Sequence, residues 1–158
     1  MIKIGKHKIG LNYKPFIIAE MSGNHNQSFD RAIQIVEAAA KAGVHALKLQ
    51  TYTKDTMTID HSKGEFVVDI DLWKGTNLYD LYDKAHTPWE WHEEIFKHSR
   101  KLGMVPFSTP FDITAVNFLE KLNVDFYKIA SFENTDLPLI KAVASTGNYV
   151  HRTWPPKT

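Results

Sequence analysis

Residues 16–50 read FIIAEMSGNHNQSFDRAIQIVEAAAKAGVHALKLQ, which has the pattern of a complete strand–helix–strand unit. The run Phe16–Ala19 is wholly apolar, as is typical of a strand covered on both faces. From Phe29 to Ala42 the apolar residues recur at helical spacing, with capping residues at both ends. Ala46–Leu49 is a second short strand pattern. A unit of this kind predicts a parallel sheet.

The same alternation continues along the chain. Apolar runs at Met104–Phe107 and Phe126–Ile129 predict two further strands, each followed by a helical pattern. A small β-hairpin turning near Gly5 precedes the first unit. Four βα units in succession fit either a doubly wound sheet or the first half of a TIM (β/α)8 barrel. No glycine-rich GxGxxG or Walker pattern is present, which disfavours the nucleotide-binding doubly wound alternative.

A long polar and aromatic stretch from Thr51 to Thr87 separates the second predicted strand from the next strong helix. Within it, Leu78–Ala85 has the pattern of a short helix. Connections of this length in a compact domain usually serve a function, so we expect this stretch to be a functional loop.

The bulk properties limit the classes of function. The 158 residues are 43% hydrophobic and carry 19 basic and 18 acidic side chains, a net charge of +1. A core can form, and no overall field favours nucleic acid or an anionic membrane as a partner. The absence of cysteine excludes disulfides and thiolate zinc sites and fits a cytoplasmic location. Neither a signal peptide nor a membrane span is predicted.

Reactive polar side chains stand at the end of every predicted strand. They are Glu20 after the first strand, Lys48 and Gln50 in the second, Ser108, Thr109 and Phe111 after the third, and Lys128, Ser131 and Glu133 after the fourth. The carboxyl ends of parallel strands meet at one edge, so these groups should converge. Lysines and hydroxyls suit a phosphate or carboxylate ligand, and a nearby carboxylate can act as a general base. We therefore predict a site for an anionic metabolite.

Each of these residues also has an ordinary structural explanation, because strand-terminal polar groups often cap helices or meet solvent. Lys48 and Lys128 interrupt apolar runs, where an unpaired charge is costly, which favours a functional role. The same reasoning applies to Glu20. For Ser108 we expect packing or capping, whereas Glu133 fits a functional acid and a surface acid equally well.

Three histidines are weaker candidates. His92 and His98 share a helix with two glutamates, but their spacing does not reproduce the HExxH zinc arrangement, and we expect a solvated face there. His25 follows the first strand and either lines the site or orders its loop; the residues alone leave both readings open.

Several motifs resemble, in order and spacing, the motif string of the nonulosonic (sialic) acid synthase family. They are FIIAEMSGNHNQS from residue 16, ALKLQTY from residue 46, FSTPFD from residue 107 and YKIASFENTDLPLI from residue 127. The segment LWKGTNLYDLYDKAHTPWEW, from residue 72, is similar to the pseudaminic acid branch of the family rather than to the N-acetylneuraminate branch. The likeness covers about the first 147 residues.

The resemblance implies a TIM barrel that condenses phosphoenolpyruvate with an amino sugar and water and releases phosphate. In the pseudaminic branch the acceptor is a 2,4-diacetamido-2,4,6-trideoxy hexose of the altrose series. By the same resemblance Glu20 is the catalytic acid that acts on the water or on the aldehyde end of the sugar. Phosphoenolpyruvate contacts are implied for Lys48, Thr109, Lys128 and Ser131, and contacts to the sugar or the reacting carbons for Gln50, Phe111 and Glu133.

The resemblance also implies parts that we do not expect in this chain. Family members use a divalent metal of the Mn or Mg type, held by histidines from the second half of the barrel. Full-length members are homodimers with a carboxy-terminal antifreeze-like domain. We expect residues 1–147 to be the amino-terminal half of the barrel, and the second half, the metal ligands and the extra domain to be absent.

After Gly147 the sequence departs from the family pattern, and Pro155 and Pro156 disfavour a central strand. Residues 148–158 are therefore predicted to be a divergent tail. Half a barrel has open sheet edges, so we expect it to self-associate and to be inactive alone. Three alternatives remain: a fragment of an N-acetylneuraminate or related synthase, a non-catalytic half-barrel interaction module, and a related aldolase-type or phosphoheptonate synthase barrel.

Overall fold

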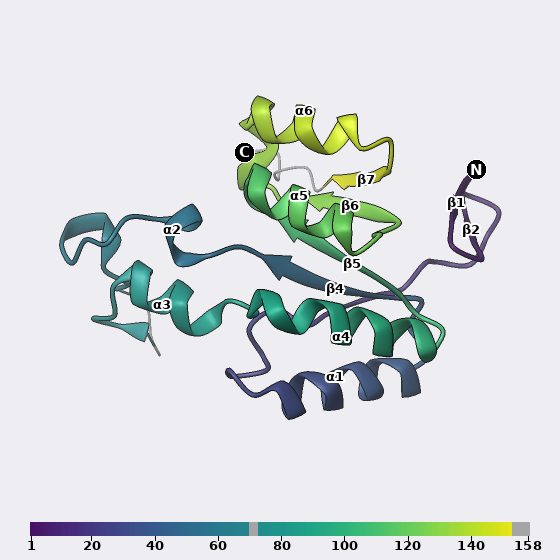
Figure 1. Cartoon of the computed structure of the whole chain (residues 1–158), viewed down its shortest axis with the longest axis horizontal. Helices are drawn as coiled ribbons and strands as arrows, with labels where there is room; N and C mark the ends of the chain where they lie inside the picture. Colours follow the sequence, from purple (N-terminus) through teal and green to yellow (C-terminus); the bar gives the residue numbers. More distant parts are fainter. Residues whose placement is uncertain (70–72, 153–158) are drawn as a thin grey trace.

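A computed structural model describes residues 1–69 and 73–152 (Figure 1). Within this part a five-stranded parallel sheet has the order β3-β4-β5-β6-β7, with a separate two-stranded hairpin, β1-β2. The strands are β1 (Ile2–Ile4), β2 (His7–Ile9), β3 (Ile18–Glu20), β4 (Ala46–Thr51), β5 (Val105–Pro110), β6 (Phe126–Ile129) and β7 (Tyr149–Arg152). The helices are α1 (Phe29–Lys41), α2 (Lys54–Met57), α3 (Leu78–Ala85), α4 (Trp89–Lys101), α5 (Ile113–Lys121) and α6 (Leu137–Ser145), with the 3-10 turns η1 (Gly64–Phe66) and η3 (Phe132–Thr135).

The order of the strands in the sheet equals their order in the sequence. A doubly wound sheet reverses its order at a switch point, whereas consecutive neighbours in one direction are the arrangement of a (β/α)8 barrel. The predicted α/β class and the choice of the barrel-type order are therefore confirmed for the described residues.

The helices cover one face of the sheet, and Ile4 of the hairpin packs against the other face at the end where the strands begin. Leu47, Leu49 and Ile129 belong to the large core that the helices form with one face. On the other face, Phe107 and Phe126 stack with ring centroids 3.8 Å apart, in a second core that also holds Ile4 of the hairpin. Side chains alternate along each strand, so the two cores lie on the two sides of one sheet.

Helix starts are fixed by side-chain caps in the loops that follow the strands. Ser28 Oγ accepts a hydrogen bond from the amide of Arg31 at the start of α1. Asp112 caps α5, and Asp136 caps α6 in the same way, each by accepting amide hydrogen bonds from the first turn. These caps satisfy amides that have no partner within the helix, and so determine where each loop after a strand ends.

The hairpin turns at Gly5, whose φ of 53° lies in the left-handed region that glycine adopts readily. It was predicted, and it lies at the end of the sheet where the strands begin, while the segment from Thr51 to Thr87 lies at the end where they finish (Figure 1). That long segment contains α2, η1 and α3, and its residues 70–72 lie outside the described residues.

Two boundaries differ from the sequence-based predictions. The first strand is Ile18–Glu20 rather than Phe16–Ala19, because the Phe16 ring stacks on His45 at 5.3 Å next to the hairpin. The prediction of no strand after Gly147 is wrong: β7 pairs in parallel with β6. Pro155 and Pro156 follow β7 and lie outside the described residues, so they remove no amide from its ladder.

His92 is buried in α4, and the prediction of a solvated face for it is wrong. Its Nδ1 lies 3.2 Å from the Pro88 carbonyl and its Nε2 lies 2.9 Å from Thr51 Oγ1. The Ser108 hydroxyl is 2.6 Å from the same Thr51 oxygen, which confirms the packing role expected for Ser108. Burial lowers the pKa of His92 from 6.5 to about 4. His98, on the same helix, is partly exposed and lies 3.4 Å from Glu37.

Acid is expected to destabilise the protein through His92. The unfolded chain takes up a proton near pH 6.5, whereas folded His92 resists protonation until about pH 4. The stability that neutral His92 contributes is fully present above pH 6.5. As the pH falls from 6.5 to about 4, the free energy of unfolding decreases by about 3 kcal/mol. Urea unfolding between pH 7 and 4 measures it. His92→Gln should flatten the slope and the exposed control His61→Gln should keep it; an unchanged slope in His92→Gln contradicts the assignment.

Within the described residues, no helix is both long enough and apolar enough to cross a membrane.

Candidate active site

The strand register places the predicted site residues on one face of the sheet. Glu20 of β3 stands level with Lys48 of β4, and Gln50 of β4 stands level with Thr109 of β5. Residues level with one another on parallel strands point to the same side, and so do residues two apart on one strand. All four side chains therefore share the face opposite the helices.

The same face continues onto the last two strands. Ser108 is paired with Tyr127, which sets Thr109 level with Lys128. Lys128 is in turn level with His151 of β7. The upper row of this face thus runs from Gln50 through Thr109 and Lys128 to His151, near the carboxyl ends of the strands.

Lys48 forms an ion pair with Glu20, the residue level with it on β3. The lysine is nearly buried, and burial together with the positive charge of Lys128 lowers its pKa to about 8. The Ser22 amide donates to Glu20 Oε1 at 3.2 Å, which holds the carboxylate from the loop side. The pair keeps a carboxylate and a weakly solvated ammonium group adjacent to each other.

A second acid–base pair lies at the end of β6. Burial lowers the pKa of Lys128, and burial also raises the pKa of Glu133, while the opposite charges partly counteract both shifts. The Glu133 side chain is half-buried, and its Oε2 is buried with no hydrogen-bond partner among the described residues. An ordinary surface acid would be hydrated, so this geometry favours the functional reading of Glu133.

Thr109 has the most informative environment of the face. Its side chain is 1% exposed, yet its Oγ1 has no hydrogen-bond partner among the described residues. Buried hydroxyls are almost always paired, and leaving one unpaired costs about 1–3 kcal/mol. A hydroxyl beside two lysines is thus available to donate to a bound oxyanion.

The remaining predicted residues lie around this group. Gln50 Oε1 accepts a hydrogen bond from Ser22 Oγ at 3.3 Å, so Gln50 is tied to the loop after β3. Phe111 packs edge-on against Tyr52 at 5.4 Å, next to the long segment. Ser131 directly precedes η3, and its side chain makes no capping hydrogen bond to that turn. Gln50 therefore belongs to the shared face, whereas Phe111 and Ser131 follow the ends of β5 and β6.

His151 is a candidate that the sequence interpretation missed, because it was assigned to the tail. Burial lowers the pKa of His151, and the nearby charges of Lys128 and Lys48 lower it further. The alternation of Tyr149 and His151 with Val150 between them was the available signal for a strand with a polar residue on this face. His151 thus adds a third nitrogen base to the shared face, after Lys48 and Lys128.

The residues do not fit a metal site on their own. Across residues 1–69 and 73–152, no three side chains of the His, Cys, Asp or Glu type come close enough to hold a metal ion. That metal ligands lie in the second half of the family barrel stays a prediction.

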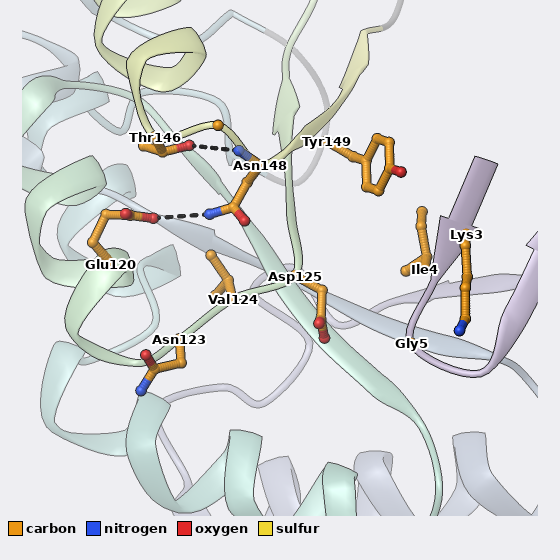
Figure 2. A pocket seen from close by; sticks show the side chains of 11 residues that line it. Lys3, Ile4, Gly5, Glu120, Asn123, Val124, Asp125, Thr146, Asn148 and Tyr149 are labelled. Atoms are coloured by element: carbon orange, nitrogen blue, oxygen red, sulfur yellow. Dashed lines mark hydrogen bonds between the residues drawn. The ribbon is translucent and has the colours of Figure 1, made fainter.

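A polar cavity of about 550 Å³ lies at the opposite end of the sheet, between the hairpin and the loops that precede β6 and β7 (Figure 2). Glu120 stands at its wall and accepts hydrogen bonds from Tyr127 Oη at 2.5 Å and from Asn148 Nδ2 at 3.1 Å. Reacting groups of βα barrels lie at the carboxyl ends of the strands, so this cavity is not the candidate active site.

Taken together, the strand order and the lysine–carboxylate face define an α/β protein with a barrel-type strand order and charged side chains at the carboxyl ends of its strands. A model described as the NeuB family matches residues 35–153, so the chain belongs to the NeuB family.

Two relatives carry names that agree with the resemblance. The pseudaminic acid synthase of Helicobacter pylori is 47% identical over 132 residues, which are 84% of this chain and 39% of the relative. The pseudaminic acid synthase of Campylobacter jejuni subsp. jejuni serotype O:2 is 44% identical over 131 residues, 83% of this chain and 38% of the relative. The chain thus spans about two fifths of the length of these relatives.

A solved structure agrees with the fold. The N-acetylneuraminic acid (sialic acid) synthetase of Leptospira borgpetersenii, crystallised with citrate, superposes with a TM-score of 0.84 at 27% identity. The match covers 99% of this chain and 50% of that chain. The family match also runs through β7, up to residue 153.

Proposed function

We propose that this chain supplies the phosphoenolpyruvate-binding part of a pseudaminic acid synthase. The reaction would condense phosphoenolpyruvate with a 2,4-diacetamido-2,4,6-trideoxy hexose and water to give pseudaminic acid and phosphate. The observation that carries the proposal is the shared face on which Lys48, Lys128 and the unpaired Thr109 hydroxyl meet. The identity to pseudaminic acid synthases supports the choice of sugar class.

The electrostatics of the face suit an anion with two acidic groups. The pKa values of both Lys48 and Lys128 are lowered by burial, so each ammonium group lacks the solvation that it would have in water. A phosphate or carboxylate group would replace that solvation with charge-assisted hydrogen bonds, which are about twice as strong as neutral ones. Thr109 Oγ1 would gain the partner that it lacks.

The carboxylates would then serve the reacting atoms. A carbon–carbon bond forms between the methylene carbon of phosphoenolpyruvate and the aldehyde carbon of the sugar, whose oxygen takes up a proton; water adds to the carbon that bears the phosphate, and loss of phosphate from that carbon leaves the keto group. Glu20, held by Lys48 and the Ser22 amide, is placed to exchange a proton with the water or with the aldehyde oxygen. Gln50, Phe111 and Glu133 would line the sugar, next to the segment from Thr51 to Thr87.

A chimeric protein tests this assignment. Residues 1–147 would be joined to the carboxy-terminal remainder of the Helicobacter pylori relative and assayed for phosphate release from phosphoenolpyruvate. We expect release that depends on the 2,4-diacetamido sugar, and at least about 100-fold less release in the Glu20→Gln chimera, because a general acid–base group typically contributes 10²–10⁴-fold. The chain alone is expected to release none.

The same assay separates the alternatives. Equal turnover with a plain N-acetylhexosamine would favour the N-acetylneuraminate branch. No turnover with either sugar, although the chimera is folded, would contradict the proposed function.

A second candidate, a non-catalytic half-barrel that pairs with another polypeptide, has one observation in its favour. An apolar hollow of about 270 Å³ lies on the face opposite the helices, between the hairpin and residues such as Phe16, Ile18 and Phe126. Turnover by the chimera would show that this face closes into a catalytic barrel.

A further inference from the structure

His25 is fully buried in the loop that follows β3, residues 21–28, and both of its ring nitrogens are engaged. The amide of Gln27 donates to Nδ1 at 3.1 Å, so Nδ1 carries no proton. Nε2 therefore carries the ring proton and donates it to Thr87 Oγ1, 3.2 Å away. The neutral ring thus joins loop 21–28 to the start of α4, across 62 positions of sequence.

Two further contacts hold the same loop against the chain just before Thr87. Gln27 Nε2 donates to the carbonyls of Lys84, at 3.0 Å, and His86, at 2.6 Å. Gly23 approaches so closely that a Cβ there would lie 2.9 Å from the carbonyl oxygen of Ala85, a distance that real Cβ atoms do not tolerate. Loop 21–28 is therefore fitted to residues 84–87, which end the long segment that begins at Thr51.

The other end of the loop reaches the charged face. Ser22 is the link, because its amide donates to Glu20 Oε1 and its hydroxyl donates to Gln50 Oε1. Ser22 has a φ of 50°, a conformation that a non-glycine residue keeps only when its surroundings fix it. The position of the Glu20 carboxylate is thus connected through one short loop to the contacts that His25 makes.

We propose that His25 is a positioning residue for Glu20. His25 fixes loop 21–28 on residues 84–87 and so couples the Glu20 carboxylate to the segment from Thr51 to Thr87. The identity of the reaction rests on the proposed function, but the coupling itself does not. In the synthase, rearrangement of that segment around a sugar would be transmitted to the group that exchanges the proton. Of the two readings of His25, the burial of its ring and the engagement of both nitrogens favour ordering of the loop.

The ring can keep both contacts only while it is neutral. Protonation would place a hydrogen on Nδ1, directly opposite the Gln27 amide hydrogen. The basic groups that face the ring are His86, from the junction before α4, and His92, from α4 itself, and Trp91 of α4 packs edge-on against it at 5.4 Å. Burial, followed by the charge of His86, lowers the pKa of His25, consistent with this requirement.

Amide hydrogen exchange of Ser22 tests the coupling, because it reports the Glu20 contact whether or not any substrate binds. In the chain, Thr87→Val should raise the exchange rate of the Ser22 amide about fivefold, which is the effect of losing one neutral hydrogen bond. Gly23→Ala should raise this rate by at least as much. The matched controls Thr58→Val and Gly10→Ala should stay within twofold of the unsubstituted chain, because the Thr58 hydroxyl makes no described hydrogen bond and a Cβ at Gly10 meets its nearest neighbour at 3.5 Å. The Leu49 amide, in the core, is the reference for global opening.

A pH profile separates positioning from simple structural support. Ser22 protection should fall in a step at the pH at which the His25 ring protonates by NMR, below 6.5. Leu49 protection should follow only the gradual loss of global stability expected from His92 and show no such step. In His25→Asn, whose Oδ1 can still accept from the Gln27 amide, this step should be absent. Three results would each overturn the proposal. The first is unchanged Ser22 exchange in Thr87→Val and Gly23→Ala, and the second is a pH step that persists in His25→Asn. The third is an equal increase of exchange at Ser22 and Leu49 in all three variants. Failure of the proposed function alone would appear as absence of phosphoenolpyruvate binding with the Ser22 response intact.

Discussion

Replacing Lys128 with methionine is expected to weaken phosphoenolpyruvate binding by about 100-fold. The ammonium group lies level with Thr109 on the shared face, and burial already lowers its pKa. A charge-assisted hydrogen bond to a poorly solvated cation is worth up to about 3 kcal/mol, which corresponds to this loss in affinity. Isothermal titration calorimetry of the chain with phosphoenolpyruvate measures it.

The matched control is Lys141→Met, because Lys141 is exposed on α6 and takes no part in the shared face. Its dissociation constant should stay within twofold of the unsubstituted chain. Equal affinities for Lys128→Met and Lys141→Met would remove Lys128 from the proposed site.

Phe107→Ala is expected to cost about 3–5 kcal/mol of unfolding free energy, the usual range for a buried phenylalanine. Phe107 is fully buried and stacks on Phe126, in the core that the hairpin covers with Ile4. A domain is typically stable by only about 5–15 kcal/mol, so this change removes a large share of the total. Urea unfolding monitored by far-UV circular dichroism gives the difference.

Phe132→Ala is the control of the same chemistry, because Phe132 is 92% exposed in η3. It should change the unfolding free energy by no more than about 0.5 kcal/mol. A loss below about 1 kcal/mol for Phe107→Ala would mean that the face opposite the helices is not packed as described.

The sheet could be predicted because the sequence pattern of most of its strands is local. Short apolar runs bounded by caps and glycines identify parallel strands, and a sequential series of βα units restricts the order. The exception is β7, because the prolines at 155 and 156 argue against a strand although Tyr149–Arg152, just before them, alternates as a strand does. The effect of a proline on a ladder is limited to its own position, so the strand forms before it.

The charged face could also be predicted, because alternation along a strand fixes the side to which a residue points. Lys48 and Lys128 stand out in apolar runs, and register then brings them to one face. The partners of buried histidines could not be predicted in this way. His92 finds Thr51 at a separation of 41 positions and His25 finds Thr87 at 62, contacts that only the assembled fold creates.

The most direct test of the central claim is an NMR titration of the isotope-labelled chain with phosphoenolpyruvate. If the strands direct Lys48, Thr109 and Lys128 into one anion site, the amides of these residues should show the largest chemical-shift changes, while Asn123 and Thr146 at the opposite cavity remain unchanged. Saturable shifts confined to Asn123 and Thr146, or no shifts at the carboxyl ends of β4, β5 and β6, would contradict the account.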